Sequence, residues 1–248
     1  ISILVDVAAA FLNALLDSDV YIEFPEGLLE YLESKGIYLA DHIIKLKRAQ
    51  YGLVQSPRLW MMTFAKILIS LGLTQCKTDP CLFTLHDPDG NLLALVAVYC
   101  DDSIIAGIRK HVDRIKKGIS NAVVISDLGN LVRHLGVDYE FGQDKSGKYI
   151  RSSMTDYLDA IVRDFETDVK ATVKEHKTPG AAVTPPLRSV PEDKIVLQEL
   201  YRSYVGRIMF ACGKSEPGLS NACRELTCHL NAPNEEHWNA LSHLVGYL

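Results

Sequence analysis

The stretch from Val96 to Gly107, VAVYCDDSIIAG, constrains the fold of the 248-residue chain more than any other part of the sequence. One apolar run leads into Tyr99, two aspartates follow, and a second apolar run resumes at once. Two apolar runs around such a short polar break predict a tight β-hairpin with Cys100, Asp101 and Asp102 at its tip. Adjacent carboxylates repel one another and are costly to remove from water, so a counter-charge or solvent must meet them.

Two interpretations of this acid pair follow from the residues alone. Aspartate is common in turns, so Asp101 and Asp102 can be turn residues with no further role. Alternatively, they meet Asp6, which lies near the end of a buried strand predicted over residues 1–7. Three carboxylates at strand ends supply the hard oxygen ligands that suit Mg²⁺, and paired Mg²⁺ ions are the device of phosphoryl-transferring polymerases and nucleases. Bound cations would relieve the repulsion between the neighbouring acids.

The remaining pattern mixes strands and helices first and is helical afterwards, which predicts an α+β chain. Ser56 is predicted as the N-cap of a helix with Pro57 at its first position. Expected strands cover residues 20–24, 43–47, 81–86, 91–99, 103–107 and 132–141, with turns at 87–90 and 142–147. Expected helices cover residues 56–71, 112–119, 154–165, 197–212, 219–230 and 235–248.

Composition sets weaker bounds on function. The net charge of −5 argues mildly against a nucleic-acid-binding protein, because such proteins usually carry a basic face. The segments at residues 43–58 and 109–117 are basic although the whole chain is acidic, so the net charge does not decide whether the protein binds nucleic acid. The six cysteines contain no CxxC pair, which predicts buried, reduced thiols. No uncharged apolar run is long enough to predict a membrane span, and both ends interrupt apolar patterns, so we expect a piece of a longer protein.

Tyr99-Cys100-Asp101-Asp102 resembles the Tyr-x-Asp-Asp box of reverse transcriptases. Further segments are similar, in order, to blocks of the copia-type retrotransposon enzymes: LVDVAAAFLNALLDSDVYIEFPEG from residue 4, KLKRAQYGLVQSPRLW from residue 45, KTDPCLF from residue 77, SDLGNLVRHLGVDYE from residue 126, YRSYVGRIMF from residue 201 and NAPNEEHWNALSHLVGYL from residue 231. The combination is specific because the matches run over nearly the whole chain.

This resemblance implies a right-hand polymerase palm with an antiparallel sheet and flanking helices, followed by a helical thumb or connection region. We expect the palm at residues 1–145 and the helical region at residues 146–248, with a proline-rich linker near residues 178–193. The family's fingers are expected to be largely missing, because they lie upstream of the matching blocks. Ribonuclease H is expected downstream.

The resemblance also implies roles for individual residues. Asp6, Asp101 and Asp102 match the catalytic triad that binds two Mg²⁺ ions, with Mn²⁺ as an alternative. Phe11 matches the aromatic residue that closes against the sugar 2′ position and excludes ribonucleotides; its alternative role is as a plain core residue. Tyr99 matches the tyrosine that touches the primer or template.

In the same comparison, Gln55 matches the glutamine that lines the nucleotide pocket, with Ser56 and Pro57 starting the helix behind it. Lys45, Lys47 and Arg48 are candidates for holding the nucleic-acid backbone. A solvated strand face explains these three cations equally well.

The expected function is therefore that of an RNA-directed DNA polymerase fragment. Its expected partners are an RNA or DNA template with a primer, deoxynucleoside triphosphates, and the fingers, ribonuclease H and integrase segments of a Pol polyprotein, with no membrane. The expected location is the cytoplasm, in a virus-like particle with access to the nucleus. One alternative is an inactive retrotransposon remnant that acts at most as a binding module. A nuclease or nucleotide cyclase on a related palm is a second alternative, which the Gln55–Pro57 block disfavours.

Overall fold

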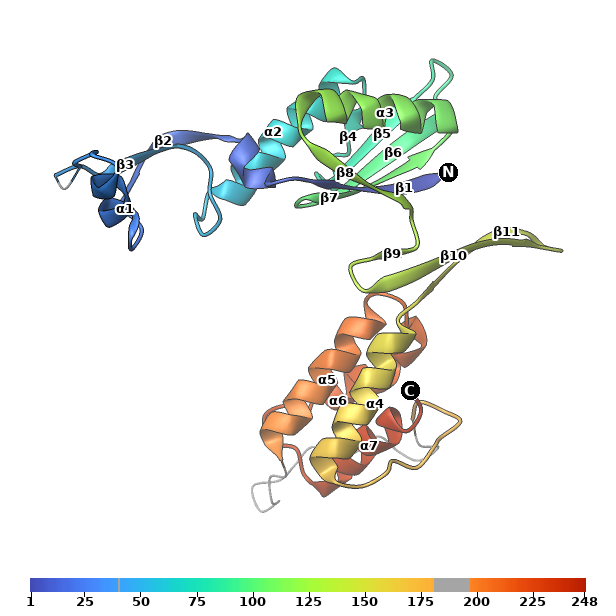
Figure 1. The fold of residues 1–248 in the computed structure, drawn as a ribbon. Coiled ribbons are helices and arrows are strands. Elements are labelled where there is room, and N and C mark those ends of the chain that lie inside the picture. Colours follow the sequence, from blue (N-terminus) through green and yellow to red (C-terminus); the bar gives the residue numbers. More distant parts are fainter. Residues whose placement is uncertain (40, 181–196) are drawn as a thin grey trace. The chain divides into compact units, whose positions relative to one another are not determined.

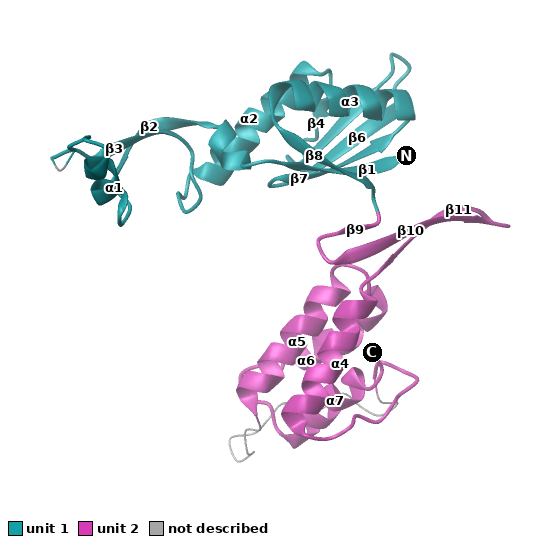
Figure 2. Ribbon diagram, viewed as in Figure 1, with its two compact units in different colours: residues 1–131 teal, residues 132–248 magenta. Residues whose placement is uncertain are grey.

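The computed structural model describes residues 1–39, 41–180 and 197–248, which form two compact units. Figure 2 colours these units, residues 1–131 and residues 132–248. Each unit has its own hydrophobic core, so each has the internal packing of a separate domain. The predicted palm of residues 1–145 would thus include part of the second unit. The palm and thumb assignments remain predictions.

A six-stranded sheet forms the centre of the first unit, with the strand order β4-β5-β6-β7-β1-β8. All neighbouring strands are antiparallel, as predicted. The strands are β1 (Ser2–Val7), β4 (Thr74–Gln75), β5 (Leu82–His86), β6 (Leu92–Tyr99), β7 (Asp102–Gly107) and β8 (Ile125–Asn130). The sequence did not predict β8, because its residues are almost all exposed and show no apolar alternation. The N-terminal strand β1 lies inside the sheet, between β7 and β8 (Figure 1).

Two helices, α2 (Ser56–Ser70) and α3 (Arg109–Ala122), pack on one face of this sheet. Alternate residues of β6 are buried, which is the period of a strand with one covered face. The helices bury residues at a spacing of three or four, which gives each helix one apolar side. The shared core contains Trp60, Phe64 and Leu68 of α2, Val112, Ile115 and Ile119 of α3, and Ala94, Val96 and Val98 of β6.

A two-stranded arm interrupts the first unit between β1 and α2. It consists of β2 (Leu15–Ile22) and β3 (Ile44–Arg48), with the short helix α1 (Leu28–Ser34) between them. The 3-10 helix η1 (Ala10–Asn13) leads into the arm. Helix α1 buries no residue, so the arm is held mainly at its base. There, Arg48 donates a hydrogen bond to the Leu12 carbonyl at 3.0 Å, and Arg58 of α2 pairs with Asp17.

The second unit joins a small sheet to a helical bundle. Its strands are β9 (Arg133–His134), β10 (Val137–Asp144) and β11 (Gly147–Ser153), in the order β11-β10-β9. Its helices are α4 (Thr155–Val169), α5 (Gln198–Cys212), α6 (Ser220–Thr227) and α7 (Glu235–Val245), with the 3-10 helix η2 (Pro217–Leu219) before α6. The helices follow the predicted pattern. Of the linker predicted near residues 178–193, residues 181–193 lie outside the described part of the chain.

Two strand predictions in the second unit were wrong. The single strand expected over residues 132–141 is broken by a turn at Leu135 and Gly136, both of which have positive φ. The turn expected at residues 142–147 is mostly strand, because β10 continues to Asp144 and pairs with the unpredicted β11. The ring of Tyr149 lies over Gly142, where any side chain would collide with it. A cross-strand contact of this kind cannot be read from the local pattern.

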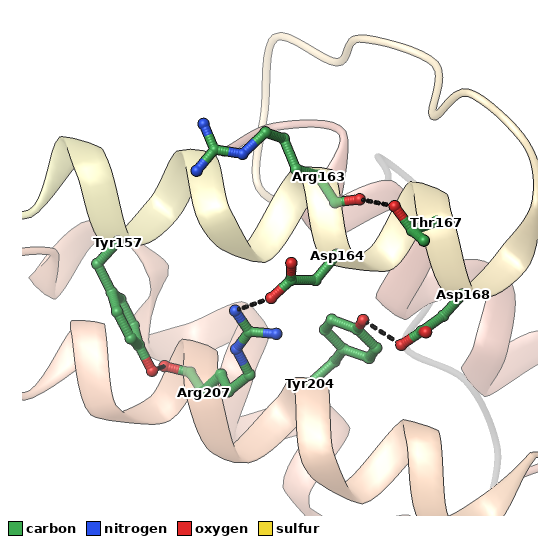
Figure 3. Close-up of polar contacts among 7 residues, drawn as sticks. All are labelled: Tyr157, Arg163, Asp164, Thr167, Asp168, Tyr204 and Arg207. Atoms are coloured by element: carbon green, nitrogen blue, oxygen red, sulfur yellow. Dashed lines mark hydrogen bonds and ion pairs between the residues drawn. The ribbon is translucent and has the colours of Figure 1, made fainter.

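Polar contacts fix helix α4 against helix α5 in the bundle (Figure 3). The hydroxyl of Tyr204 donates to Asp168 at 2.6 Å, and Arg207 pairs with Asp164 at 2.8 Å. The Tyr157 hydroxyl reaches the Arg207 carbonyl at 3.4 Å. Burial and the hydrogen bond to Asp168 raise the pKa of Tyr204, so its hydroxyl stays a donor at neutral pH. These contacts set the register between the two helices.

Two predictions from composition can be compared with the structure. All six cysteines are free, as predicted, but the expectation that they are buried was wrong. Cys223 is buried, Cys76 and Cys212 are half-buried, and Cys81, Cys100 and Cys228 are exposed. Within the described ranges, no helix combines the length and the apolar character that a membrane span requires.

Gly107 tests how closely β6 and β7 are packed. Its φ is +147°, and an added Cβ would lie 2.4 Å from the Leu93 carbonyl oxygen. We expect Gly107→Ala to lower the free energy of unfolding by roughly 2–4 kcal/mol, because backbone strain and a steric clash act together. Gly90→Ala is the matched control: φ is +86° there, but no atom lies within 4 Å. Urea denaturation of both variants should show a larger loss for Gly107→Ala, and equal losses would contradict the packing argument.

Candidate active site

The sheet brings the three predicted metal ligands to one of its ends. Asp6 of β1 lies directly opposite Asp102 of β7 in the antiparallel register. Directly opposed residues of neighbouring strands project from the same face, so both carboxylates belong to one side of the sheet. Asp101 precedes β7, and its carbonyl accepts a 2.9 Å hydrogen bond from the amide of Val7. All three side chains are half-buried.

The hairpin tip consists of two residues rather than the predicted three. Tyr99 pairs with Asp102 in the register, so Cys100 and Asp101 form the loop and Asp102 is already a strand residue. Cys100 has a φ of +56°, and a positive φ at only the first loop position is the pattern of a type II′ turn. Trp60 stabilises this conformation, because its buried indole N–H donates to the Cys100 carbonyl at 2.7 Å.

The donor set suits a hard cation, but the side chains do not form a closed cage. Three carboxylates are the oxygen ligands that Mg²⁺ prefers. In the described part of the chain, no group of three or more His, Cys, Asp or Glu side chains is arranged to hold a metal ion. The backbone register places Asp6 beside Asp102, with Asp101 in the adjoining turn, so the three acids lie at the same end of the sheet without forming such a group. Metal binding by these residues remains a prediction.

Tyr51 belongs to this site, although the sequence did not single it out. Its ring centroid lies 4.6 Å from that of Phe11, with the planes tilted by 48°. Partial burial and the negative charges of Asp101 and Asp6 raise the pKa of the Tyr51 hydroxyl. Phe11 itself is only 9% exposed, so it is packed like a core residue while facing an accessible partner. The signal that could have revealed Tyr51 is the Tyr-Gly turn just before a helix that starts with Ser-Pro.

Ser56 does not cap helix α2 as predicted. Gln55 occupies the N-cap position, and Pro57 lies in the first turn. The buried Ser56 hydroxyl instead donates to the Gln50 carbonyl at 2.6 Å and accepts from the Gln50 amide at 3.1 Å. These two hydrogen bonds outweigh a cap because they satisfy both backbone groups of one residue. Ser56 therefore fixes the turn that carries Tyr51.

The other predicted binding residues differ in accessibility. Tyr99 is 60% exposed at the end of β6, beside Asp102 in the register. Lys45 pairs with Asp19 at 2.7 Å, and Arg48 is bound to the Leu12 carbonyl. Lys45 and Arg48, two of the three candidates for holding the nucleic-acid backbone, thus have partners within the protein. The third candidate, Lys47, is exposed. Tyr99 and Lys47 are exposed side chains that a ligand can reach.

Comparison with known proteins decides the family. Residues 3–178 match the family described as reverse transcriptase (RNA-dependent DNA polymerase). The chain belongs to the reverse transcriptase family. The match includes all three acids, Phe11, Tyr51 and the Gln55–Pro57 block, so the whole candidate site lies within the family region.

Three relatives show which reverse transcriptases this chain resembles. It is 27% identical over 248 residues to a retrovirus-related Pol polyprotein from transposon TNT 1-94 of Nicotiana tabacum, with 98% of this chain and 18% of that protein covered. It is 28% identical over 248 residues to the Pol polyprotein from transposon RE2 of Arabidopsis thaliana, with 98% and 16% covered. It is 26% identical over 245 residues to a transposon Ty5-1 protein of Saccharomyces cerevisiae, with 98% and 74% covered.

The relatives confirm the resemblance to copia-type retrotransposon reverse transcriptases. The chain spans less than a fifth of the length of the two plant polyproteins. It therefore corresponds to one segment of a much longer product in those organisms.

Trp60→Phe tests the support of the acidic turn. The variant keeps an aromatic ring beside Phe64 but loses the donor to the Cys100 carbonyl. We expect a loss of about 1–3 kcal/mol in the free energy of unfolding and faster hydrogen exchange at the Val7 amide, which is bound to the Asp101 carbonyl. Trp238→Phe in the second unit is the matched control and should leave this exchange unchanged. Unchanged exchange in Trp60→Phe would show that the turn does not depend on the indole.

Proposed function

We propose that this chain supplies the palm, and part of the thumb or connection region, of an RNA-directed DNA polymerase within a retrotransposon Pol polyprotein. The observation that carries the proposal is the pairing of Asp6 with Asp102, with Asp101 in the adjoining turn, inside a segment that matches the reverse transcriptase family. A pair of turn acids without function would not need a third carboxylate from a distant strand.

The proposed reaction is template-directed addition of deoxynucleotides to a primer on RNA or DNA. The primer 3′-hydroxyl oxygen attacks the α-phosphorus of a deoxynucleoside triphosphate, the new P–O bond replaces the bond to the β-phosphate, and pyrophosphate leaves. Two Mg²⁺ ions, or Mn²⁺, held by Asp6, Asp101 and Asp102 would lower the pKa of the primer hydroxyl and offset the charge that develops on the phosphate. The protein contributes the rigid placement of these carboxylates.

Each element of the site has a part in this placement. Asp6 and Asp102 lie on central strands, where paired neighbours limit their movement. Phe11 is proposed to lie against the sugar of the incoming nucleotide, and the exposed Tyr99 is proposed to touch the end of the primer or template. Gln55 remains a candidate for the nucleotide pocket at the start of α2, with Ser56 and Pro57 behind it.

The other Pol segments would complete the enzyme. We propose that fingers, ribonuclease H and integrase act together with this chain, since the two plant relatives are Pol polyproteins of which the matching part is less than a fifth. A virus-like particle in the cytoplasm, with access to the nucleus, is the proposed location. An inactive remnant is the alternative, and primer extension separates the two.

Asp101→Asn and Asp6→Asn test the proposed metal ligands. Each should reduce Mg²⁺-dependent primer extension at least about a hundredfold, because several kcal/mol of charge stabilisation would be lost. Asp113→Asn on the outer side of α3 is the control and should retain activity. Extension is measured on primed RNA and DNA templates, with the chain joined to the segments that flank the matching region in the tobacco polyprotein.

The same assay on the 248 residues alone should give weak extension, because the triphosphate would lack the remaining binding segments. Robust extension by this chain alone would contradict that expectation. An inactive flanked protein with normal folding would favour the remnant, and full activity of Asp101→Asn would reject the metal site.

Phe11→Ala tests sugar selection. A ring beside the sugar leaves no room for a 2′-hydroxyl, so the small side chain should admit ribonucleotides while deoxynucleotide addition largely continues. The measurement is single-nucleotide extension with matched ribo- and deoxynucleotides, compared as ratios of kcat/KM. An unchanged ratio would assign Phe11 to the core alone.

A further inference from the structure

Tyr51 packs against Phe11 and is half-exposed. Its ring contacts Phe11 on one side, with centroids 4.6 Å apart. Burial and the negative charges of Asp101 and Asp6 raise the pKa of its hydroxyl. The side chain is 56% exposed, so a ligand can reach it.

The backbone holds Tyr51 in this position. Gly52 has a φ of +96°, a backbone conformation that residues other than glycine rarely adopt. This conformation allows the chain to turn directly after Tyr51. The preceding residue, Gln50, is bound through both backbone groups to the buried hydroxyl of Ser56. A half-exposed aromatic side chain on a turn that is fixed from both sides is well suited to contact a ligand.

We propose that Tyr51 is a specificity-determining residue that positions Phe11. The two rings together form the wall beside the sugar of the incoming nucleotide, and the Tyr51 hydroxyl donates a hydrogen bond to an oxygen of that nucleotide. This inference rests on the proposed polymerase function. The sequence comparison implied that Gln55 lines the nucleotide pocket. In this proposal, Tyr51 makes that contact with the nucleotide instead.

The ring and the hydroxyl of Tyr51 have different roles in this proposal. Phe11 is carried by the four-residue helix η1 and is packed in the core of the first unit, and without the Tyr51 ring it would lose its aromatic neighbour on one side. A freed Phe11 would leave space for a 2′-hydroxyl. A tyrosine hydroxyl is protonated at neutral pH, so that of Tyr51 can donate to sugar or phosphate oxygens.

Tyr51→Ala and Tyr51→Phe separate the ring from the hydroxyl. Both are compared with wild type and with Gln55→Ala in the polymerase that carries the flanking segments, using single-nucleotide extension with ribo- and deoxynucleotides. Tyr31→Ala is the matched control, since Tyr31 is 58% exposed on α1. Values of kcat and KM are determined separately, and circular dichroism verifies folding.

Tyr51→Ala should lower discrimination against ribonucleotides by about threefold to tenfold, which corresponds to the loss of one aromatic pair. Tyr51→Phe should keep this discrimination but raise the KM for deoxynucleotides by about twofold to tenfold, as expected for one lost hydrogen bond. Tyr51→Phe retains the ring, so it tests the hydroxyl even if Tyr51→Ala fails to fold.

Two results would overturn the proposal while leaving the polymerase function intact. One is an active wild type whose selectivity and KM are unchanged in both Tyr51 variants. The other is a rise in KM in Gln55→Ala that neither Tyr51 variant shows. An inert, folded wild type would reject the polymerase function and this inference together.

Discussion

The pairing of β1 with β7 is the constraint on which the rest of the structure depends. It places Asp6 opposite Asp102, and it needs β1 in the middle of the sheet, where β8 covers its other edge. An antiparallel pair has a side-chain period of two, so a shift of one residue would send Asp6 to the helix-covered face. The alternating burial along β6, together with the packing of Ile3, Val5 and Val7 of β1 in the helix-covered core, prevents this shift. The hydrophobic core thereby sets the position of the carboxylates.

Helix α2 serves this arrangement through residues of its first two turns. Near its start, Ser56 binds Gln50 and fixes the turn of Tyr51; one turn later, Trp60 binds the carbonyl of Cys100. The same helix thus supports two loops that come from distant parts of the sequence. The left-handed conformation of Cys100 costs about 1–2 kcal/mol for a residue with a side chain, and the indole hydrogen bond offsets part of that cost. Packing and site geometry are therefore coupled through a few side chains.

The sequence was sufficient where local patterns decide the structure. The hairpin around Asp101 and most helix positions follow from apolar periodicity and turn residues. The role of Ser56 was misjudged because a serine before a proline favours a cap, whereas the buried backbone of Gln50 offers stronger partners. Tyr51 was missed for a related reason: its significance arises from Phe11 and Asp101, which are far from it in the sequence. Strand β11 was missed because its own sequence has only a weak strand pattern, and its pairing with β10 is what stabilises it as a strand.

The central position of β1 also has a consequence for how the molecule folds. Asp6 and Asp102 are separated by 96 positions (102 − 6), and the hydrogen bonds that join their strands close a loop of that length. Non-local pairing of this kind slows folding, because chain entropy is lost before contacts compensate for it. During synthesis from the N-terminus, β1 must remain unpaired until β7 and β8 have left the ribosome. An apolar strand exposed for that interval makes the nascent chain prone to aggregation, and chaperone binding during synthesis is the natural protection for it.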